Sequence, residues 1–239
     1  MSRRFFDPQP FSAGQRHQLG ESASHHIGKV LRMRQGDALT LFNGEGGEYQ
    51  GSIIAVNKKS VEVHIERFDD IDRCPPLAVT VALPLIKGER MDYAIQKATE
   101  LGASRFDLLL CERSDVRLAG DRLEKKISHF HQVAVSACEQ CGMNRVPTIS
   151  GAFLFGEYIA QAAADVRLIA HPGESPLATS PAPGQSLILL TGPEGGFSDA
   201  EITAATAAGF ASFALGERVL RAETAPVALL AALWARLSL

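Results

Sequence analysis

The sequence predicts a two-domain α/β protein, in which a small β-barrel precedes a domain with a mostly parallel sheet between layers of helices. Three observations predict this. Short alternating segments separated by turn signals occupy residues 38–65, strand and helix patterns alternate after residue 76, and a charged segment with a proline pair, residues 69–76, lies between them. We therefore expect a barrel over residues 1–72 and an α/β domain over residues 73–239.

The composition is that of a globular chain. It has 239 residues, 46% hydrophobic and 21% charged, which excludes disorder and collagen. Four cysteines are too few for a disulfide framework and are typical of a reducing compartment. Residues 1–8 lack the apolar core of a signal peptide, and no uncharged apolar run approaches the roughly 18–20 residues that span a bilayer. We expect a cytoplasmic protein without a membrane partner.

The net charge of −3 argues against a protein that coats nucleic acid by charge alone. Residues 1–65 nevertheless carry eight Lys and Arg against six Asp and Glu, and the basic residues are grouped within residues 29–34. This grouping fits either a local RNA contact or an ordinary solvated face.

In the first domain, strands are predicted at residues 38–42, 49–55 and 60–65, with a glycine-rich turn at residues 43–47. In the second, the strands are residues 77–86, 106–111, 166–170 and 187–191, and the early helices are residues 90–101 and 121–141. Gly102 and Gly142 are typical residues after a helix end. Ligands of such sheets bind outside the carboxyl ends of the strands.

A glycine-rich turn follows the strand at residues 187–191. Ser198 and Glu201 have the spacing of a capping box, and Phe197 with Ile202 that of a hydrophobic staple, so a helix begins here. Residues 192–196 between strand and cap expose backbone groups without large side chains, which suits close approach of a ligand. The spacing matches neither common phosphate-binding motif, and a tight turn without a ligand explains it equally well.

A second turn, residues 214–223, joins a strand to the last helix. Thr224 is predicted as the N-cap, with Pro226 in the first turn. The apolar face of that helix is predicted to contain Val227, Leu230, Leu233, Trp234 and Leu237. The turn crowds together the charged residues Glu217, Arg218, Arg221 and Glu223. A solvated loop with internal ion pairs is one interpretation, but the turn should emerge at the same sheet edge as the glycine-rich turn, which favours a functional one.

These two turns resemble the signature of the SPOUT class of S-adenosylmethionine (SAM) methyltransferases, and specifically its RsmE family. The matching stretches occur in family order and cover most of the chain: residues 26–34, 87–102, 112–114, 138–147, 192–196 and 215–221. Ala222, where a hydroxyl residue is expected, and Pro226, where Ala is more usual, depart from the pattern. The departures put in doubt a role for the side chain at position 222.

The resemblance implies a fold and an activity. It implies an N-terminal PUA-like barrel that binds RNA, a C-terminal SPOUT α/β domain with a trefoil knot around SAM, and an obligate homodimer. The implied reaction is methylation of N3 of a uridine in the decoding region of bacterial 16S rRNA, in the 30S subunit, without a metal. Alternatives are another SPOUT methyltransferase acting on a ribose hydroxyl or a tRNA base, a non-catalytic RNA-binding ribosome assembly factor, and a nucleotide-binding protein with a regulatory barrel.

By resemblance, the cofactor would be bound by Ile169, His171, Thr191, Gly192, Pro193, Glu194, Gly195, Gly196, Leu215, Gly216, Val219, Leu220, Arg221 and Thr224. Methyl transfer is an in-line displacement, so positioning should dominate. The uridine N3 proton must leave while negative charge spreads to two carbonyls, which a cation stabilises. Arg221 is the expected cation, with Glu194 and Glu223 as candidates to accept the proton or orient Arg221.

The expected RNA-binding residues are Arg3, Arg4, His26, Lys29, Arg32, Arg34, Arg113, Asn144 and Arg145. The last three match family positions and are assigned either to the site, including that of a partner subunit, or to RNA-backbone contact or loop capping. The Cys138-x-x-Cys141 pair falls late in a helix rather than at its start, so we expect a structural role. Zinc is not expected, because no second cysteine pair or histidine pair follows at zinc-finger spacing.

Overall fold

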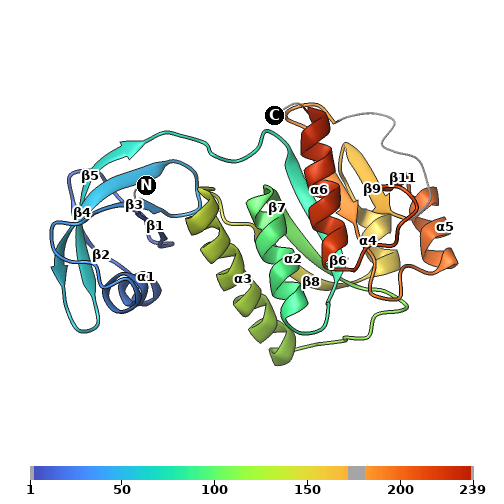
Figure 1. Ribbon diagram of the computed structural model, residues 1–239, viewed down its shortest axis with the longest axis horizontal. Helices are drawn as coiled ribbons and strands as arrows, with labels where there is room; N and C mark the ends of the chain where they lie inside the picture. Colours follow the sequence, from blue (N-terminus) through green and yellow to red (C-terminus); the bar gives the residue numbers. More distant parts are fainter. Residues whose placement is uncertain (1–2, 172–180, 238–239) are drawn as a thin grey trace. The chain divides into compact units, whose positions relative to one another are not determined.

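The structure, a computed structural model, describes residues 3–171 and 181–237 and divides into two compact units (Figure 1). Unit 1 comprises residues 1–74 together with residues 138–146, and unit 2 comprises residues 75–137 and 147–239. The division expected from the sequence did not assign residues 138–146 to the first unit. They belong there because Cys138 and Met143 pack in an apolar cluster with Phe42.

Unit 1 is built on a five-stranded sheet in the order β1-β3-β4-β5-β2. Its strands are β1 (Arg3–Phe6), β2 (Arg16–Gln18), β3 (Ala38–Phe42), β4 (Glu48–Val56) and β5 (Val61–Asp69). A short helix α1 (Glu21–His25) continues directly into a π-helical turn η1 (His26–Val30). The β1–β3 pair is parallel and the other pairs are antiparallel. The two strands and the helix that precede residue 30 were not predicted, because each is too short to show a periodic pattern.

The core of unit 1 follows from alternation along its strands. On β5, Val61, Val63 and Ile65 are buried while the residues between them are not, as expected for a strand with one face in a core. A bulge at Gln50 and Gly51 interrupts the pairing of β4 with β5. A Cβ at Gly51 would collide with the carbonyl oxygen of His64, so this close strand approach requires glycine.

Unit 2 contains a six-stranded sheet in the order β11-β9-β10-β6-β7-β8, in which every neighbouring pair is parallel. The strands are β6 (Ala78–Pro84), β7 (Ala103–Leu110), β8 (Thr148–Leu154), β9 (Val166–Ala170), β10 (Ser186–Leu190) and β11 (Ala211–Phe213). The helices are α2 (Glu89–Glu100), α3 (Asp121–Cys141), α4 (Phe155–Gln161), α5 (Asp199–Ala207) and α6 (Thr224–Leu237), and the end of α3 from Cys138 onward belongs to unit 1. The mostly parallel sheet predicted from the sequence is confirmed, whereas β8 and α4 were not predicted.

Helices cover the sheet of unit 2 in two groups. Helices α2 and α6 lie side by side (Figure 1) and contact each other, and the indole nitrogen of Trp234 on α6 donates a hydrogen bond to the carbonyl oxygen of Leu101. Helices α4 and α5 pack together in an apolar cluster that includes Phe155, Ala205 and Ile188 of the sheet. Two helical layers leave the strand ends as the accessible part of the sheet.

Because all six strands run the same way, the segments after β6, β7, β9, β10 and β11 emerge at one edge of the sheet. The residues predicted to carry chemistry in this unit lie on these segments, except Ile169, which lies within β9, and Thr224, which begins α6. No helix in the described part of the chain combines the length and apolar character needed to cross a membrane.

Candidate active site

A cavity of about 320 Å³ lies at the carboxyl edge of the sheet of unit 2. The segments after β9, β10 and β11 line it, together with one residue that follows β7. Its volume is at the lower end of the range of about 300–1,000 Å³ for small-molecule sites. The two turns singled out in the sequence therefore meet around one space.

Most of the expected cofactor-binding residues line this cavity. They are His171, Gly192, Pro193, Glu194, Gly195, Gly196, Leu215, Gly216, Val219 and Leu220. Ile169 and Thr191 are instead fully buried, and neither Arg221 nor Thr224 is among the lining residues. Other lining residues have apolar side chains, such as Phe197, Phe213 and Ala222, and were not assigned to the cofactor from the sequence. An apolar residue type alone does not distinguish a ligand contact from ordinary core packing.

The glycine-rich turn is fixed by the predicted capping box. The Ser198 hydroxyl accepts a hydrogen bond from the Glu201 backbone at 3.2 Å, and the Glu201 carboxylate accepts one from the Ser198 backbone at 2.9 Å. Gly196 has φ +67° and donates its N–H to the carbonyl oxygen of Pro193 at 2.8 Å. A non-glycine residue would be strained there. The turn is thus tight, held at its helical end, and open toward the cavity.

Glu201 also connects this turn to the segment after β7. Its second carboxylate oxygen accepts a hydrogen bond from the backbone N–H of Glu112 at 2.8 Å. The neighbouring Cys111 thiol is buried, and burial together with the charge of Glu201 raises its pKa to about 12. Cys111 is therefore a packed thiol rather than a nucleophile at neutral pH.

Arg113 bridges from that segment to the glycine-rich turn. Its guanidinium Nη1 donates to the carbonyl oxygens of Gly195 at 3.1 Å and Phe197 at 3.3 Å. Its aliphatic part packs over Gly195, where an added Cβ would lie 3.3 Å from the Arg113 Cβ. The sequence left Arg113 open between the site, an RNA contact and loop capping, and the structure gives it contacts that hold the turn beside the cavity.

Glu194 is the exposed carboxylate of the glycine-rich turn. Its Oε1 lies 3.9 Å from the guanidinium of Arg90 on α2 and 3.5 Å from the backbone nitrogen of Lys87. The ammonium of Lys87 in turn donates to Asp115 at 2.7 Å, and this hydrogen bond lowers the pKa of the Asp115 carboxyl. The turn after β6 therefore adds charged groups to the rim that sequence reasoning did not assign.

The charged turn before α6 carries two exposed arginines. Arg218 lines the cavity, whereas Arg221 lies outside the lining and its carbonyl oxygen accepts hydrogen bonds from Thr224 and Ala225. No ion pair joins the charged residues of this turn within the described ranges, so the alternative of an internally paired loop is not what the structure contains. Thr224 begins α6 instead of preceding it, which corrects the predicted N-cap by one residue.

Two polar atoms near the cavity are buried without a hydrogen-bond partner in the part of the chain that is described. They are Oγ1 of Thr191, immediately after β10, and Oε2 of Glu223. Leaving a buried polar atom unpaired costs about 1–3 kcal/mol, so such atoms near a cavity are candidates to bind a ligand. They lie beside a cavity whose lining combines glycine backbone and apolar surface with the polar side chains of Arg113, His171, Glu194 and Arg218.

Among the expected RNA-binding residues of unit 1, some side chains are exposed and others lie close to a carboxylate of the same unit. The exposed ones are Arg3, Lys29, Arg32 and Arg34. Arg4 pairs with buried Glu48 at 2.7 Å, and Arg145 lies 3.6 Å from Asp72. His26 is half-buried and lies 3.5 Å from Glu139.

Asn144 is not available for RNA. It is fully buried, its side-chain amide donates to the carbonyl oxygens of Gly47 and Ile71, and its amide oxygen accepts from the backbone of Arg73. All of these bonds are to the backbone of the chain itself, which corresponds to the loop-capping alternative for Asn144 rather than to an RNA contact. Cys138 is likewise buried, as expected for a packing residue.

Across residues 3–171 and 181–237, no group of three His, Cys, Asp or Glu side chains is arranged to hold a metal ion.

Comparisons with known proteins agree with this architecture. A family model described as an RNA methyltransferase domain matches residues 73–234, and one described as an RNA methyltransferase PUA domain matches residues 19–66. A Bacillus subtilis protein named ribosomal RNA small subunit methyltransferase E is 32% identical over 219 residues, covering 87% of this chain and 86% of its own.

Two solved structures cover 99% of this chain and 98% of their own. A Legionella pneumophila protein in complex with its bound cofactor SAM has a TM-score of 0.93 and 37% identity. A ribosomal RNA small subunit methyltransferase E from Neisseria gonorrhoeae, bound to SAM, has a TM-score of 0.91 and 32% identity. The chain therefore belongs to the ribosomal RNA small subunit methyltransferase E family, the RsmE family that its motifs resemble.

Proposed function

We propose that this chain transfers a methyl group from SAM to N3 of a uridine in 16S rRNA of the 30S subunit. Family membership supports the reaction class, and the cavity at the carboxyl edge of unit 2 carries the proposal. The glycine-rich turn that lines it has a backbone that a ligand can approach closely, and the buried hydroxyl of Thr191 beside it has no hydrogen-bond partner among the described residues. These features fit a nucleoside cofactor with polar and apolar parts.

SAM supplies a methyl group already activated on sulfur, so the residues of the chain have two tasks. They hold the donor and the acceptor nitrogen in line, and they stabilise the charge that develops on the uracil carbonyls. We propose Arg221 for the second task. Arg218 is a close alternative, because both are exposed on the same turn and Arg218 lines the cavity.

The uridine N3 proton needs an acceptor, for which we propose Glu194 or Glu223. Glu194 lies exposed at the cavity rim, and Arg90 is 3.9 Å away to orient it. Glu223 is buried and keeps one carboxylate oxygen without a hydrogen-bond partner among the described residues. Replacing each in turn with its amide removes the acceptor while preserving shape, so only the true acceptor should lower turnover strongly.

The proposal extends to the assembly. We propose that the chain acts as a homodimer in the cytoplasm, where ribosomes are found, with a trefoil knot formed around the cofactor. We also propose that residues 1–72 act as the RNA-binding domain and residues 73–239 as the catalytic one. Light scattering of the purified chain would test the dimer.

One experiment tests the reaction. The chain is incubated with methyl-labelled SAM and 30S subunits from cells that lack the enzyme, and the modified nucleotide is mapped by primer-extension arrest. Label at N3 of a single uridine in 16S rRNA is expected. Label on a ribose, label in tRNA alone, or no transfer would each refute the proposed specificity.

A further inference from the structure

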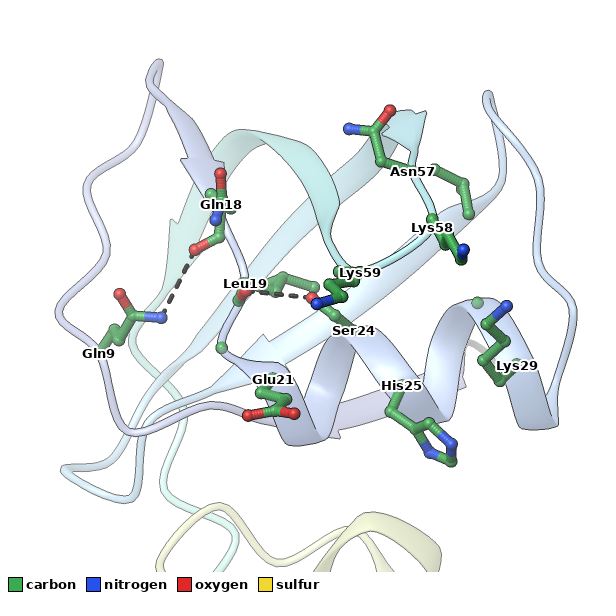
Figure 2. A pocket seen from close by; sticks show the side chains of 13 residues that line it. Gln9, Gln18, Leu19, Glu21, Ser24, His25, Lys29, Asn57, Lys58 and Lys59 are labelled. Atoms are coloured by element: carbon green, nitrogen blue, oxygen red, sulfur yellow. Dashed lines mark hydrogen bonds between the residues drawn. The ribbon is translucent and has the colours of Figure 1, made fainter.

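Unit 1 contains a cleft of about 890 Å³, larger than the cavity in unit 2. It lies between the helical segment α1–η1 and the turn that joins β4 to β5 (Figure 2). Figure 2 shows Lys58 and Lys59 on the turn, opposite His25 and Lys29 on the helical segment. Of these four residues, Lys29 alone is among the RNA-binding residues expected from the sequence.

The floor of the cleft is held firmly. The buried Ser24 hydroxyl donates to the carbonyl oxygen of Leu19 at 3.0 Å and accepts from the backbone of Val61 at 3.1 Å, which fixes the helix against β5. A Cβ at Gly28 would lie 3.4 Å from the Val56 side chain, so the helix and the hairpin approach closely there. The cleft is therefore a built feature of the unit.

The backbone beside the cleft is unusual. Segment η1 is π-helical, a conformation that is rare and occurs frequently at functional sites. Two residues later, Arg32 has φ +51°, and it is the only non-glycine residue with positive φ among those described. Such a conformation costs about 1 kcal/mol or more and clusters at functional sites.

The charges of unit 1 are distributed unevenly. Arg4 and Arg73 share Glu48, Arg67 pairs with Asp69, and Arg145 lies near Asp72. By contrast, no ion pair involves Lys29, Lys58 or Lys59 within the described part of the chain, and Glu21 is the one carboxylate among the cleft's lining residues. Arg3, Arg16, Arg32 and Arg34 likewise form no ion pair among the described residues, but of these unpaired cations only the three lysines line the cleft.

We propose that this cleft binds the sugar-phosphate backbone of the RNA substrate, with Lys29, Lys58 and Lys59 as phosphate contacts. The inference rests on the proposed function for the identity of the RNA. Phosphates are favoured over bases because three lysines line the cleft, whereas no Phe, Tyr or Trp does and His25 is the one aromatic ring among the lining residues. The contact positions the RNA without reading its sequence.

The test is the salt dependence of RNA binding by the full chain. Lys58→Gln/Lys59→Gln removes two cations from exposed positions. Each lost phosphate contact lowers the slope of log affinity against log salt by about 0.7 on single-stranded RNA, so we expect a decrease of about 1.4. At 0.15 M KCl the variant should bind protein-free 16S rRNA about tenfold more weakly than the wild type. Because the two slopes differ, the ratio of wild-type to variant affinity should fall about sevenfold between 50 and 200 mM KCl.

The matched control is Lys125→Gln/Lys126→Gln, which removes two adjacent exposed lysines from α3 of unit 2. An unchanged slope in the cleft variant, or an equal decrease in both variants, would overturn the proposal. Methyl transfer to 30S subunits is measured separately. If the wild-type chain transfers no methyl group while the cleft variant still loses slope, the proposed reaction is wrong and the cleft remains an RNA site.

Discussion

Arg113 offers a sharp test of how the cofactor cavity is held. The contacts of its guanidinium with two backbone carbonyls predict that Arg113→Ala loosens the glycine-rich turn. Both carbonyls accept from the same nitrogen, Nη1, so the two contacts are counted as one hydrogen bond from a charged donor. Such a bond contributes about 1.5–3 kcal/mol. Because the Arg113 side chain is exposed, we expect about 1–2 kcal/mol here. The dissociation constant for SAM should therefore rise about 5- to 30-fold.

Isothermal titration with SAM measures this effect, and the Michaelis constant for 30S subunits at saturating SAM gives the comparison. If Arg113 only holds the turn, Arg113→Ala should raise the dissociation constant for SAM and leave the Michaelis constant for 30S subunits nearly unchanged. Arg113→Lys should recover part of the affinity, because it keeps the charge but has a single donor head. Arg117→Ala, which removes another exposed arginine from the same segment, is the control. Unchanged SAM affinity with weaker 30S binding would refute the reasoning and return Arg113 to the RNA-contact role.

Further predictions concern separate features. Arg221→Ala should lower turnover more than about tenfold, or roughly 1.4 kcal/mol, with little change in SAM affinity; a smaller loss would exclude it as the catalytic cation. Gly192→Ala places a Cβ 3.2 Å from a backbone nitrogen and should weaken SAM binding about tenfold, whereas Gly156→Ala, with open space, should not; equal SAM titrations of the two variants would contradict this. Burial alone would raise the pKa of the Glu48 carboxyl, but hydrogen bonds from its two arginine partners lower it below 4.5. Glu48→Gln should therefore lower the free energy of unfolding near pH 7 by about 2–3 kcal/mol, less than is typical of a fully buried pair because one arginine is half exposed. The loss should shrink only as pH falls below about 4.5, and denaturant titrations showing a pH-independent difference would argue against it. Cys111, with a pKa of about 12, should resist thiol reagents at pH 8 in the native protein and react in denaturant; rapid native labelling would contradict its burial.

The sequence predicted those parts of the fold that leave a local pattern. Helix α3 begins and ends where the periodicity and Gly142 placed it, and the capping box of Ser198 and Glu201 is present as predicted. Strand β8 and helix α4 were missed because the two are short and follow each other without a turn signal. Local patterns identify elements, whereas the order of strands in a sheet depends on contacts between residues far apart in the chain.

The site was predictable to the same extent. The glycine-rich and charged turns were found from their spacing, and the rule that parallel strands share a carboxyl edge correctly brought them together. The bridging contact of Arg113 and the burial of Asn144 were not predicted, since both depend on which backbone carbonyls come near after folding. A family motif marks a position, but it does not say whether the side chain faces a ligand or holds the chain.

The same reasoning applies to charge. A net charge of −3 argued against RNA binding by charge alone, yet affinity for phosphate depends on cations that lack a partner rather than on the sum. In unit 1, Glu48 forms ion pairs with both Arg4 and Arg73. Lys58 and Lys59 lie on the turn between β4 and β5, and no carboxylate among the described residues pairs with them. Paired arginines contribute to the stability of the unit, and unpaired lysines create the local positive field. A weakly acidic net charge is therefore compatible with an RNA-backbone site at a place where unpaired cations lie close together.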